Sequence, residues 1–377
     1  MPRPSYGFLS TSPPTPCGLA TFTDALGSAL TLQGADVSVV RVLDTPGPPS
    51  TSALAVVADL VASDPASLER AVEALNANDV VFIQHEYGLY GGRDGDDVLK
   101  VLARLRVPAV AILHTVLATP TPHQRVVLNE VLRSVDAVVV MTKRAEATLH
   151  QVNDVGSTTV AVIAHGAALG RPKERRRFGV RPRLLTWGLI GPGKGIEWVI
   201  DALAQLRDLS PAPLYVIAGR THPKVLAHEG DLYRQSLINR VAANDVGHMV
   251  SFDNSYRDLD SLNELIRSAD VVLLPYDSRD QATSGVLVDA VAAGRPVIAT
   301  PFPHAVELLS TGAGMLVGHG DVDGLSAAVR RVVTDSKVAV DMASEARRIA
   351  PRLSWRAVAH QYNTMTSDLL MRTRINA

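Results

Sequence analysis

The chain contains a single cysteine, Cys17, among its 377 residues. One cysteine excludes an intrachain disulfide framework and a cysteine-rich metal site, and it is typical of a reducing compartment. The N-terminal stretch MPRPSYGFLSTSPPTPCG lacks the apolar segment and cleavage site of a signal peptide. No run of 18 or more apolar residues occurs, which excludes a transmembrane helix. We therefore expect a cytoplasmic protein, for which peripheral membrane contact stays open.

The sequence also lacks an excess of positive or negative charge, since 37 Lys and Arg residues balance 38 Asp and Glu residues. A net charge of −1 gives no general attraction to nucleic acid, so we expect no nucleic-acid partner. The hydrophobic fraction of 46% is ordinary for a globular protein, and the length predicts two domains.

Several common catalytic motifs are absent as well. Neither G-x-S-x-G nor H-E-x-x-H occurs, which excludes the commonest hydrolase and metalloprotease classes. The dinucleotide fingerprint G-x-G-x-x-G is missing, which disfavours a nicotinamide enzyme. No closely spaced set of metal ligands stands out. We therefore expect neither a metal nor a cofactor.

Short runs of Val, Ile and Leu recur instead, each followed by a segment of helical length. This alternation is typical of parallel strands that crossover helices bury on both faces. In the first half it predicts strands over Gly7–Ser10, Asp36–Val42, Val80–Gln84, Ala109–Leu113, Ala137–Met141 and Thr159–Ile163. The helices predicted between them are Gly18–Gln33, Pro65–Asn76, Pro122–Ser134 and Lys143–Val152.

The basic segment Leu169–Arg183 interrupts the alternation, and we interpret it as an interdomain linker. Contact of its basic residues with anionic lipid or an acidic glycan is the alternative to a hydrated linker. Afterwards strands are predicted over Arg183–Trp187, Leu214–Ala218, Met249–Phe252, Val271–Pro275, Pro296–Thr300 and Gly314–Val317. The expected fold is two doubly wound α/β domains, 1–170 and 183–353, in which ligands bind beyond the carboxyl ends of strands.

The stretch Asp277–Asp289 directly follows the strand sequence VVLLPY. Thr283, Ser284 and Gly285 therefore fall at the start of the next helix, where free N–H groups can bind a phosphate. Gln281 in the loop and Asp289 one turn into the helix can both accept hydrogen bonds from ligand hydroxyls. A βα unit with ordinary capping residues is the alternative.

A second turn of this kind, GLIGPGKG, places Lys194 before a helix. It is not a P-loop, because Gly195 stands where that motif requires Ser or Thr. Backbone donors and one cation suit a diphosphate without a metal. The alternative is a solvated lysine beside a tight turn. Gly18 stands at a similar helix start in the first domain, and a lone glycine is weak evidence.

Three histidines follow predicted strands of the first domain: His85, His114 and His165. At the carboxyl ends of a sheet, we expect each side chain to reach a polar pocket and not the core.

Together the motifs PCGLATFT, HT, GPGKG, ADVVLLPY and SGVLVDAVAAGRPVIAT resemble the retaining glycosyltransferases of family 4, over essentially the whole chain. The resemblance implies the GT-B fold, two facing Rossmann-like domains with a cleft between them. It also implies that the helix expected near Ser354–Met371, within 354–377, packs back onto the first domain.

The resemblance also implies roles for individual residues. Asp289 would hold the donor ribose, Thr283, Ser284 and Gly285 the sugar and diphosphate, and Lys194 the diphosphate. The strand that carries Phe252 would line the base, Gly18 would let the first domain approach the phosphates, and His114 would lie near the hexose. The acceptor is expected on the first domain near Glu86, Tyr87 and His123.

Two positions depart from the family pattern. Gln281 stands where relatives carry Glu, so it cannot act as a carboxylate nucleophile, although it would still lie beside the reacting hexose. The family's phosphate-binding arginine is also missing near Lys194, and Arg220 is the candidate substitute.

The predicted activity is metal-independent transfer of a hexose with retention, preferentially mannose from GDP-mannose, to a sugar or glycoconjugate. A UDP-sugar-dependent glucosyl- or N-acetylglucosaminyltransferase is the alternative. A sugar-nucleotide epimerase with the same fold and a sugar-binding protein without turnover are the less favoured hypotheses. The acceptor and the oligomeric state stay open.

Overall fold

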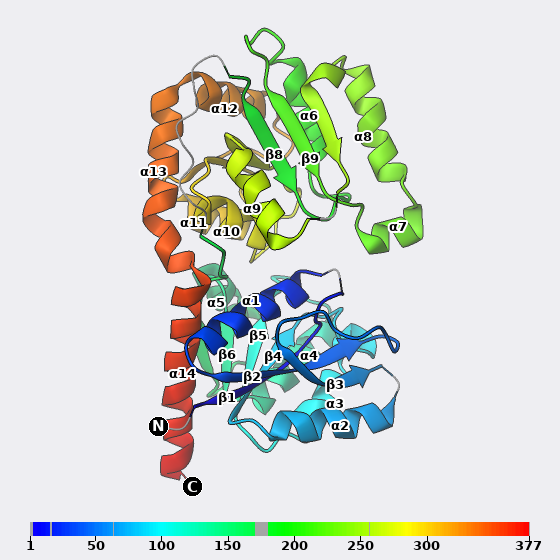
Figure 1. Ribbon diagram of the computed structural model, residues 1–377, viewed down its shortest axis with the longest axis vertical. Coiled ribbons are helices and arrows are strands. Elements are labelled where there is room, and N and C mark those ends of the chain that lie inside the picture. Colours follow the sequence, from blue (N-terminus) through cyan, green and yellow to red (C-terminus); the bar gives the residue numbers. More distant parts are fainter. Residues whose placement is uncertain (1–2, 16, 63, 170–179, 256, 377) are drawn as a thin grey trace. The chain divides into compact units, whose positions relative to one another are not determined.

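The chain folds into two α/β units (Figure 1), which the computed structural model describes over residues 3–15, 17–62, 64–169, 180–255 and 257–376. Unit 1 comprises Met1–Gly166 and Trp355–Ala377, and unit 2 comprises Ala167–Ser354. Most of the expected basic linker, including Lys173 and Arg175, lies outside the described residues.

Unit 1 is built on a parallel sheet with the strand order β3-β2-β1-β4-β5-β6-β7. Its strands are β1 (Ser5–Ser10), β2 (Asp36–Leu43), β3 (Ala55–Val61), β4 (Val80–His85), β5 (Ala109–Leu113), β6 (Ala137–Val140) and β7 (Thr159–Val162). Its helices are α1 (Gly18–Leu32), α2 (Pro65–Asn76), α3 (Val98–Leu102), α4 (Pro122–Ser134), α5 (Lys143–Val152) and α14 (Trp355–Asn376), with a 3-10 turn η1 (Arg93–Gly95).

Strand β3 is not among the strands predicted from the sequence. It is a half-exposed edge strand, and Asp59 interrupts its apolar pattern. That carboxylate accepts two hydrogen bonds from Arg41 of β2, each 2.8 Å long, and the arginine is buried. An edge strand that pairs through a salt bridge lacks the continuous apolar signal of the central strands.

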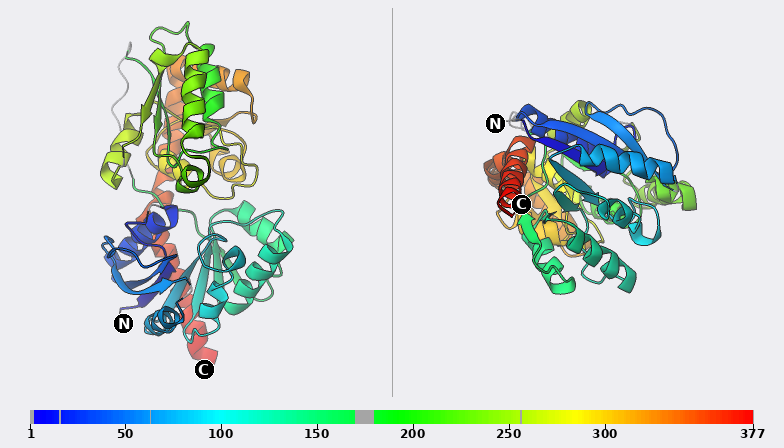
Figure 2. Two further views of the ribbon diagram at one scale, coloured as in Figure 1. Left: turned by 90° about the vertical axis from the view of Figure 1, so that its right-hand side faces the viewer. Right: turned by 90° about the horizontal axis from the view of Figure 1, so that it is seen from below.

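Helices α1 and α14 lie side by side on one face of the unit 1 sheet (Figures 1 and 2). There Phe22 of α1 and Tyr362 of α14 are buried with Phe8 and Phe82 of the sheet. The hydroxyl of Tyr6 is hydrogen-bonded 2.9 Å from both Asn363 and Thr366 of α14. The last helix is therefore part of the unit 1 core, although it follows unit 2 in the sequence.

Unit 2 contains a parallel sheet with the strand order β10-β9-β8-β11-β12-β13. Its strands are β8 (Arg183–Trp187), β9 (Leu214–Ala218), β10 (Val250–Asp253), β11 (Val271–Leu274), β12 (Val297–Ala299) and β13 (Gly314–Leu316). Its helices are α6 (Ile196–Ala204), α7 (Pro223–Glu229), α8 (Leu232–Ala243), α9 (Leu259–Ser268), α10 (Gly285–Ala292), α11 (Pro303–Leu309), α12 (Val322–Thr334) and α13 (Ser336–Leu353), with a 3-10 turn η2 (Gly247–Met249).

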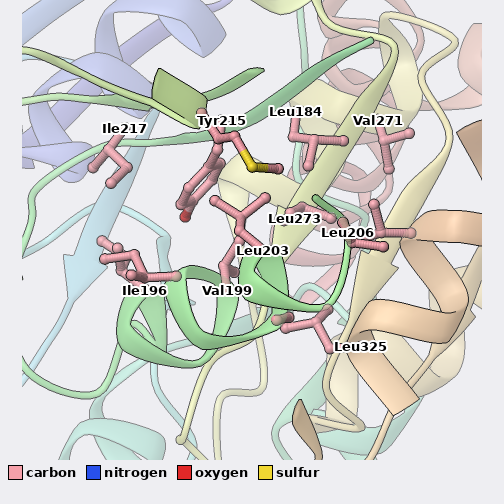
Figure 3. Packing of buried hydrophobic residues seen from close by; sticks show 14 of the residues in the cluster. Leu184, Ile196, Val199, Leu203, Leu206, Tyr215, Ile217, Val271, Leu273 and Leu325 are labelled. Carbon is pink, nitrogen blue, oxygen red and sulfur yellow. The ribbon is translucent and has the colours of Figure 1, made fainter. Parts of the chain in front are cut away.

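The core of unit 2 joins β8, β9 and β11 to α6 and α12 (Figure 3). Leu184, Leu273 and Leu203 are all buried there. The hydroxyl of Tyr215 in this layer donates to Thr186 at 2.9 Å, and Thr186 donates to the carbonyl of Leu273 at 2.7 Å. This packing fixes the positions at which β8 and β11 end.

All six strands predicted in the second half are present, and the fold class predicted from the sequence is confirmed by the structural relatives described below. Among the described helices, none is long and apolar enough to cross a membrane.

Candidate nucleotide-sugar site

The sheet of unit 2 changes direction between β8 and β11. The chain runs from β8 outward to β9 and β10, then returns to β11 on the other side of β8. The loops that follow β8 and β11 therefore leave the sheet next to each other, at the position where open α/β sheets bind ligands. Lys194 lies in the first loop, and Gln281, Thr283 and Ser284 lie in the second.

These two loops touch through their backbones. The N–H of Asp277 donates to the carbonyl of Gly193 at 2.9 Å. Gly195 has φ +63°, and a Cβ on it would lie 1.8 Å from the carbonyl oxygen of Pro275. Only glycine permits this approach, because any side chain would collide with a backbone atom.

Lys194 is held over an aromatic ring. Its ammonium lies 4.3 Å from the centre of the Tyr276 ring, which is stacked at 5.2 Å on Phe302. Burial lowers the pKa of Lys194. Among the described residues no carboxylate forms an ion pair with this lysine. The loop thus contains a partly desolvated cation that can pair with an anionic ligand.

Helix α10 begins in the second loop with Ser284 as its N-cap. The Ser284 hydroxyl accepts a hydrogen bond from the N–H of Leu287 at 3.3 Å. The backbone N–H of Ser284 donates to Nδ1 of His304 at 2.8 Å, so this amide, expected to face the donor, is already occupied. The N–H groups of Gly285 and Val286 open the helix, where no intrahelical acceptor exists for them.

The two acceptor residues of this segment differ in environment. The Nε2 of Gln281 donates to the carbonyl of Thr283 at 3.2 Å, so its side chain turns back on its own loop. Asp289 lies in the second turn of α10, half-buried, and burial raises its pKa to about 7. The described ion pairs include none with Asp289. An unpaired carboxylate of this kind is suited to accept hydrogen bonds from hydroxyls.

Arg220 and Phe252 lie at the ends of the neighbouring strands. Arg220 is exposed after β9, and its carbonyl accepts from the N–H of Ile190 at 2.8 Å, which places it beside the loop of Lys194. Phe252 is in β10, with its ring centre 5.9 Å from the guanidinium of Arg234. Arg234 is buried and donates to the carbonyl of Gly219 at 2.6 Å.

Three side chains of this unit were not singled out from the sequence: Tyr276, Arg234 and His304. Tyr276 ends the ADVVLLPY motif, so its place after the strand was a usable signal. Arg234 and His304 lie on α8 and α11, outside the quoted motifs, and nothing in the local pattern marked them.

The strand order of unit 1 changes direction in the same way, between β1 and β4. At the ends of β4 and β5, the Nε2–H of His114 donates to Oε1 of Gln84 at 2.5 Å. Beside this pair, the hydroxyl of Thr115 donates to Glu86 at 2.5 Å. The structure therefore pairs His114 with Gln84, which sets the tautomer of His114, and pairs Glu86 with the neighbouring Thr115.

The three histidines that follow predicted strands of unit 1, His85, His114 and His165, are largely buried. The ring of Phe22 lies 4.8 Å from His114, 5.1 Å from His165 and 5.1 Å from Trp355, edge to face in each case. Burial lowers the pKa of His114 to about 3, helped by the nearby His165 and His85, so its imidazole is neutral. His85 is only 1% exposed, so the expectation that its side chain reaches a pocket is corrected: it is packed in the interior, where burial lowers its pKa to about 4.

The residues expected near the acceptor lie around turn η1. Nδ1 of His123 is 2.9 Å from Asp94 of this turn. A Cβ on Gly95 would lie 3.0 Å from the carbonyl oxygen of Tyr87, so the same turn packs against Tyr87. Glu86 accepts from the N–H of Tyr87 at 3.1 Å. Glu86, Tyr87 and His123 are therefore grouped in one region of unit 1.

Gly18 is the first residue of α1, and a Cβ there would meet nothing within 4 Å. Within the described part of the chain, no group of three or more His, Cys, Asp or Glu side chains could hold a metal ion.

Comparison with known proteins places the site of unit 2 in a family context. Residues 181–335 match the family described as glycosyl transferases group 1. This match contains the loops of Lys194 and Gln281, helix α10 and His304, whereas unit 1 lies outside it.

Three curated relatives illustrate the range of similarity. Glycogen synthase of Mycobacterium tuberculosis is 29% identical over 234 residues, which cover 60% of this chain and 53% of the relative. D-inositol 3-phosphate glycosyltransferase of Jonesia denitrificans is 27% identical over 280 residues, covering 67% and 64%. Phosphatidyl-myo-inositol mannosyltransferase of Mycolicibacterium smegmatis is 29% identical over 171 residues, covering 45% and 40%. The matched region thus spans about half to two thirds of the first two relatives' length.

Solved structures match over nearly the whole chain. Sucrose-phosphate synthase of Thermosynechococcus elongatus has a TM-score of 0.79 at 20% identity, covering 98% of this chain and 100% of that one. HepE of Anabaena, solved in complex with UDP and glucose, has a TM-score of 0.75 at 19% identity, covering 97% and 100%. Both α/β units therefore have the fold of GT-B glycosyltransferase structures.

Proposed function

We propose that the protein is a retaining glycosyltransferase that moves a hexose from a nucleoside diphosphate sugar to a hydroxyl of a sugar or glycoconjugate. The observation that carries the proposal is the pair Lys194 and Asp289. Both are partly desolvated without an ion-pair partner among the described residues, and they follow the adjacent strands β8 and β11. Such side chains are typical of a site where the ligand supplies the missing partner.

Each group then has a part of the donor to bind. Lys194 contacts an oxygen of the diphosphate, together with the first N–H groups of α10, at Gly285 and Val286. Asp289 accepts hydrogen bonds from the ribose hydroxyls, which its ionised form does best. Phe252 lines the base, and Arg220 is the proposed second cation near the diphosphate.

The transfer proceeds on one face of the sugar. The bond from the anomeric carbon to the diphosphate oxygen breaks while the acceptor oxygen bonds the same carbon, and the leaving phosphate takes the acceptor proton. Gln281 is neutral and forms no covalent bond with the sugar. Positioning and stabilisation of the leaving diphosphate therefore account for the rate. With Lys194 and the α10 amides on the diphosphate, we propose that no metal is required.

The acceptor contacts unit 1 in this proposal. Glu86, Tyr87 and His123 provide hydroxyl-binding groups, and neutral His114 contacts the hexose.

Mannose from GDP-mannose is the preferred donor, which agrees with the name of the mycobacterial mannosyltransferase relative. UDP-glucose is the alternative, which agrees with the UDP and glucose bound in the Anabaena structure.

A thermal-shift panel of GDP, UDP, ADP and their sugars tests the proposal. A ligand at 100 times its Kd stabilises the folded state by about 2.7 kcal/mol, which shifts Tm by several degrees. We expect GDP and GDP-mannose to stabilise the protein most. A larger shift with UDP and UDP-glucose would establish the alternative donor, and no shift with any nucleotide would contradict the proposed function.

A further inference from the structure

The peptide bond between Thr283 and Ser284 is held from both sides. On one side its N–H donates to Nδ1 of His304 at 2.8 Å. On the other side its carbonyl accepts from Nε2 of Gln281 at 3.2 Å. In a trans peptide the N–H and C=O point in opposite directions, so these two bonds fix the rotation of the whole peptide plane.

His304 contacts this loop through its backbone as well as through its ring. Its own N–H donates to the carbonyl of Gln281 at 3.4 Å. The side chain is 5% exposed and Ser284 is 3% exposed, so their hydrogen bond is shielded from water. The bond requires Nδ1 of His304 to be unprotonated, since a backbone N–H can only donate.

Thr300 and Phe302, which precede His304, contact the same loop at its other end, at Tyr276. The hydroxyl of Thr300 donates to the carbonyl of Tyr276 at 2.5 Å, and Phe302 stacks on the Tyr276 ring that lies under Lys194. The segment Thr300–His304, which follows β12, therefore supports both the cation and the helix start of the candidate site.

The chemistry of Gln281 agrees with this arrangement. An amide can donate to the Thr283 carbonyl, whereas an ionised Glu at this position has no proton to donate and would repel the carbonyl oxygen. The neutral side chain at position 281 thus matches the peptide orientation that His304 fixes from the other side.

We propose that Gln281 and His304 are positioning residues that clamp the Thr283–Ser284 peptide, so that the N–H groups of Gly285 and Val286 face the donor diphosphate. This inference rests on the proposed function. It assigns Gln281 to the geometry of the donor site and not to the chemical step, and it makes His304 a determinant of donor affinity outside the contact surface.

Three variants test the clamp: His304→Ala, His304→Asn and Gln281→Glu. Alanine removes the acceptor, whereas the Oδ1 of asparagine can occupy the place of Nδ1 and accept the Ser284 N–H. We expect His304→Ala and Gln281→Glu each to weaken GDP or UDP binding by roughly 3- to 10-fold, as the loss of one hydrogen bond does. We expect His304→Asn to stay within about twofold of the unsubstituted protein, measured by isothermal titration calorimetry.

Hydrogen exchange of the Ser284 amide provides a readout without any ligand. The amide lies at the N-cap, outside the helical ladder, and its protection depends on His304. Exchange should become at least about tenfold faster in His304→Ala and return close to the original rate in His304→Asn. Unchanged protection in His304→Ala, or donor binding as tight in Gln281→Glu as in the unsubstituted protein, would overturn the clamp.

The outcome separates the clamp from the function on which it rests. If Lys194→Ala and Asp289→Ala weaken nucleotide binding while His304→Ala does not, the clamp is wrong and the donor site stands. If no variant affects nucleotide binding, the donor site itself is wrong, and with it the proposed role of the clamp.

Discussion

The Lys194 ammonium lies 4.3 Å from the centre of the Tyr276 ring, although the two residues belong to loops that follow different strands. The ring orients the cation and partly replaces its water shell. Because the Tyr276 ring is stacked on Phe302, it cannot turn away from the lysine without losing that contact. The position of the charge is thus fixed before any ligand arrives.

Replacing the ring tests this relationship. We expect Tyr276→Leu to weaken nucleotide binding by about 2- to 30-fold, because a cation–π contact contributes roughly 0.5 to 2 kcal/mol. Tyr276→Phe is the matched control, since it keeps the ring and should bind nucleotide within about twofold of the unsubstituted protein. Calorimetric titration measures both. Equal affinity of the Leu and Phe variants would show that the ring does not orient Lys194.

Asp289 makes the stability of the protein depend on pH. Burial raises its pKa to about 7, above the value of about 3.9 in an unfolded chain. The folded state therefore retains a proton that the unfolded state loses, and this contribution to stability is complete below pH ~4 and lost as pH rises to ~7. Asp289→Asn, which cannot ionise, should gain about 4 kcal/mol over the unsubstituted protein at pH 8 and almost nothing at pH ~4.

The control for this effect is Asp208→Asn. Asp208 is exposed, and its hydrogen bonds with Arg330 lower its pKa, so the variant should gain no stability with rising pH. Thermal unfolding between pH 4 and 8 gives the Tm of the unsubstituted protein, Asp289→Asn and Asp208→Asn. A Tm difference for Asp289→Asn that is the same at both ends of this range would contradict the assigned burial.

We expect that no other residue can replace Gly195 where its loop touches the carbonyl of Pro275. Gly195→Ala should lower stability by at least ~2 kcal/mol, because alanine adds strain at φ +63° and a clash with the carbonyl of Pro275. Gly230→Ala separates the two causes: Gly230 has φ +61° but nothing within 4 Å of a Cβ, so only about 1 kcal/mol is expected. Similar losses of Tm in both variants would mean that the close approach to Pro275 is not maintained in solution.

The Gln84–His114 pair predicts an NMR observation. With its pKa lowered to about 3, the C2 proton of His114 should not titrate between pH 5 and 8. Gln84→Glu places a carboxylate beside Nε2 and should raise the pKa of His114 by about 1 unit or more, whereas Gln84→Met should not. An ordinary titration of His114 in the unsubstituted protein would contradict its burial.

The fold was predictable because its strands are buried on both faces. The runs VVFI at the start of Val80–His85 and VVLL over Val271–Leu274 are uninterrupted and apolar in the sequence, and the helices Pro65–Asn76 and Pro122–Ser134 were predicted to the residue. Strand β3 was missed because its edge position leaves it half-exposed and its Asp59 pairs across the sheet with Arg41.

The candidate site was predictable only where motifs follow strands. Lys194, Ser284 and Asp289 were found from glycine-bearing turns, which need a specific backbone. His304 could not be found this way, because its contact with Ser284 spans 20 residues and joins the starts of two different helices, α10 and α11. The same limit applied to His85, whose position after a strand indicated a pocket although its ring is interior.

Isothermal titration of GDP and UDP into Lys194→Ala and Asp289→Ala tests whether these two residues bind the donor nucleotide. Lys337→Ala and Asp208→Ala are the controls, because both residues are exposed and form ion pairs on α13 and beside α12. We expect each site variant to lose at least about tenfold in affinity for the nucleotide that binds the unsubstituted protein, while both controls stay within twofold. Affinities in Lys194→Ala and Asp289→Ala equal to those of the controls would contradict a donor site at the ends of β8 and β11.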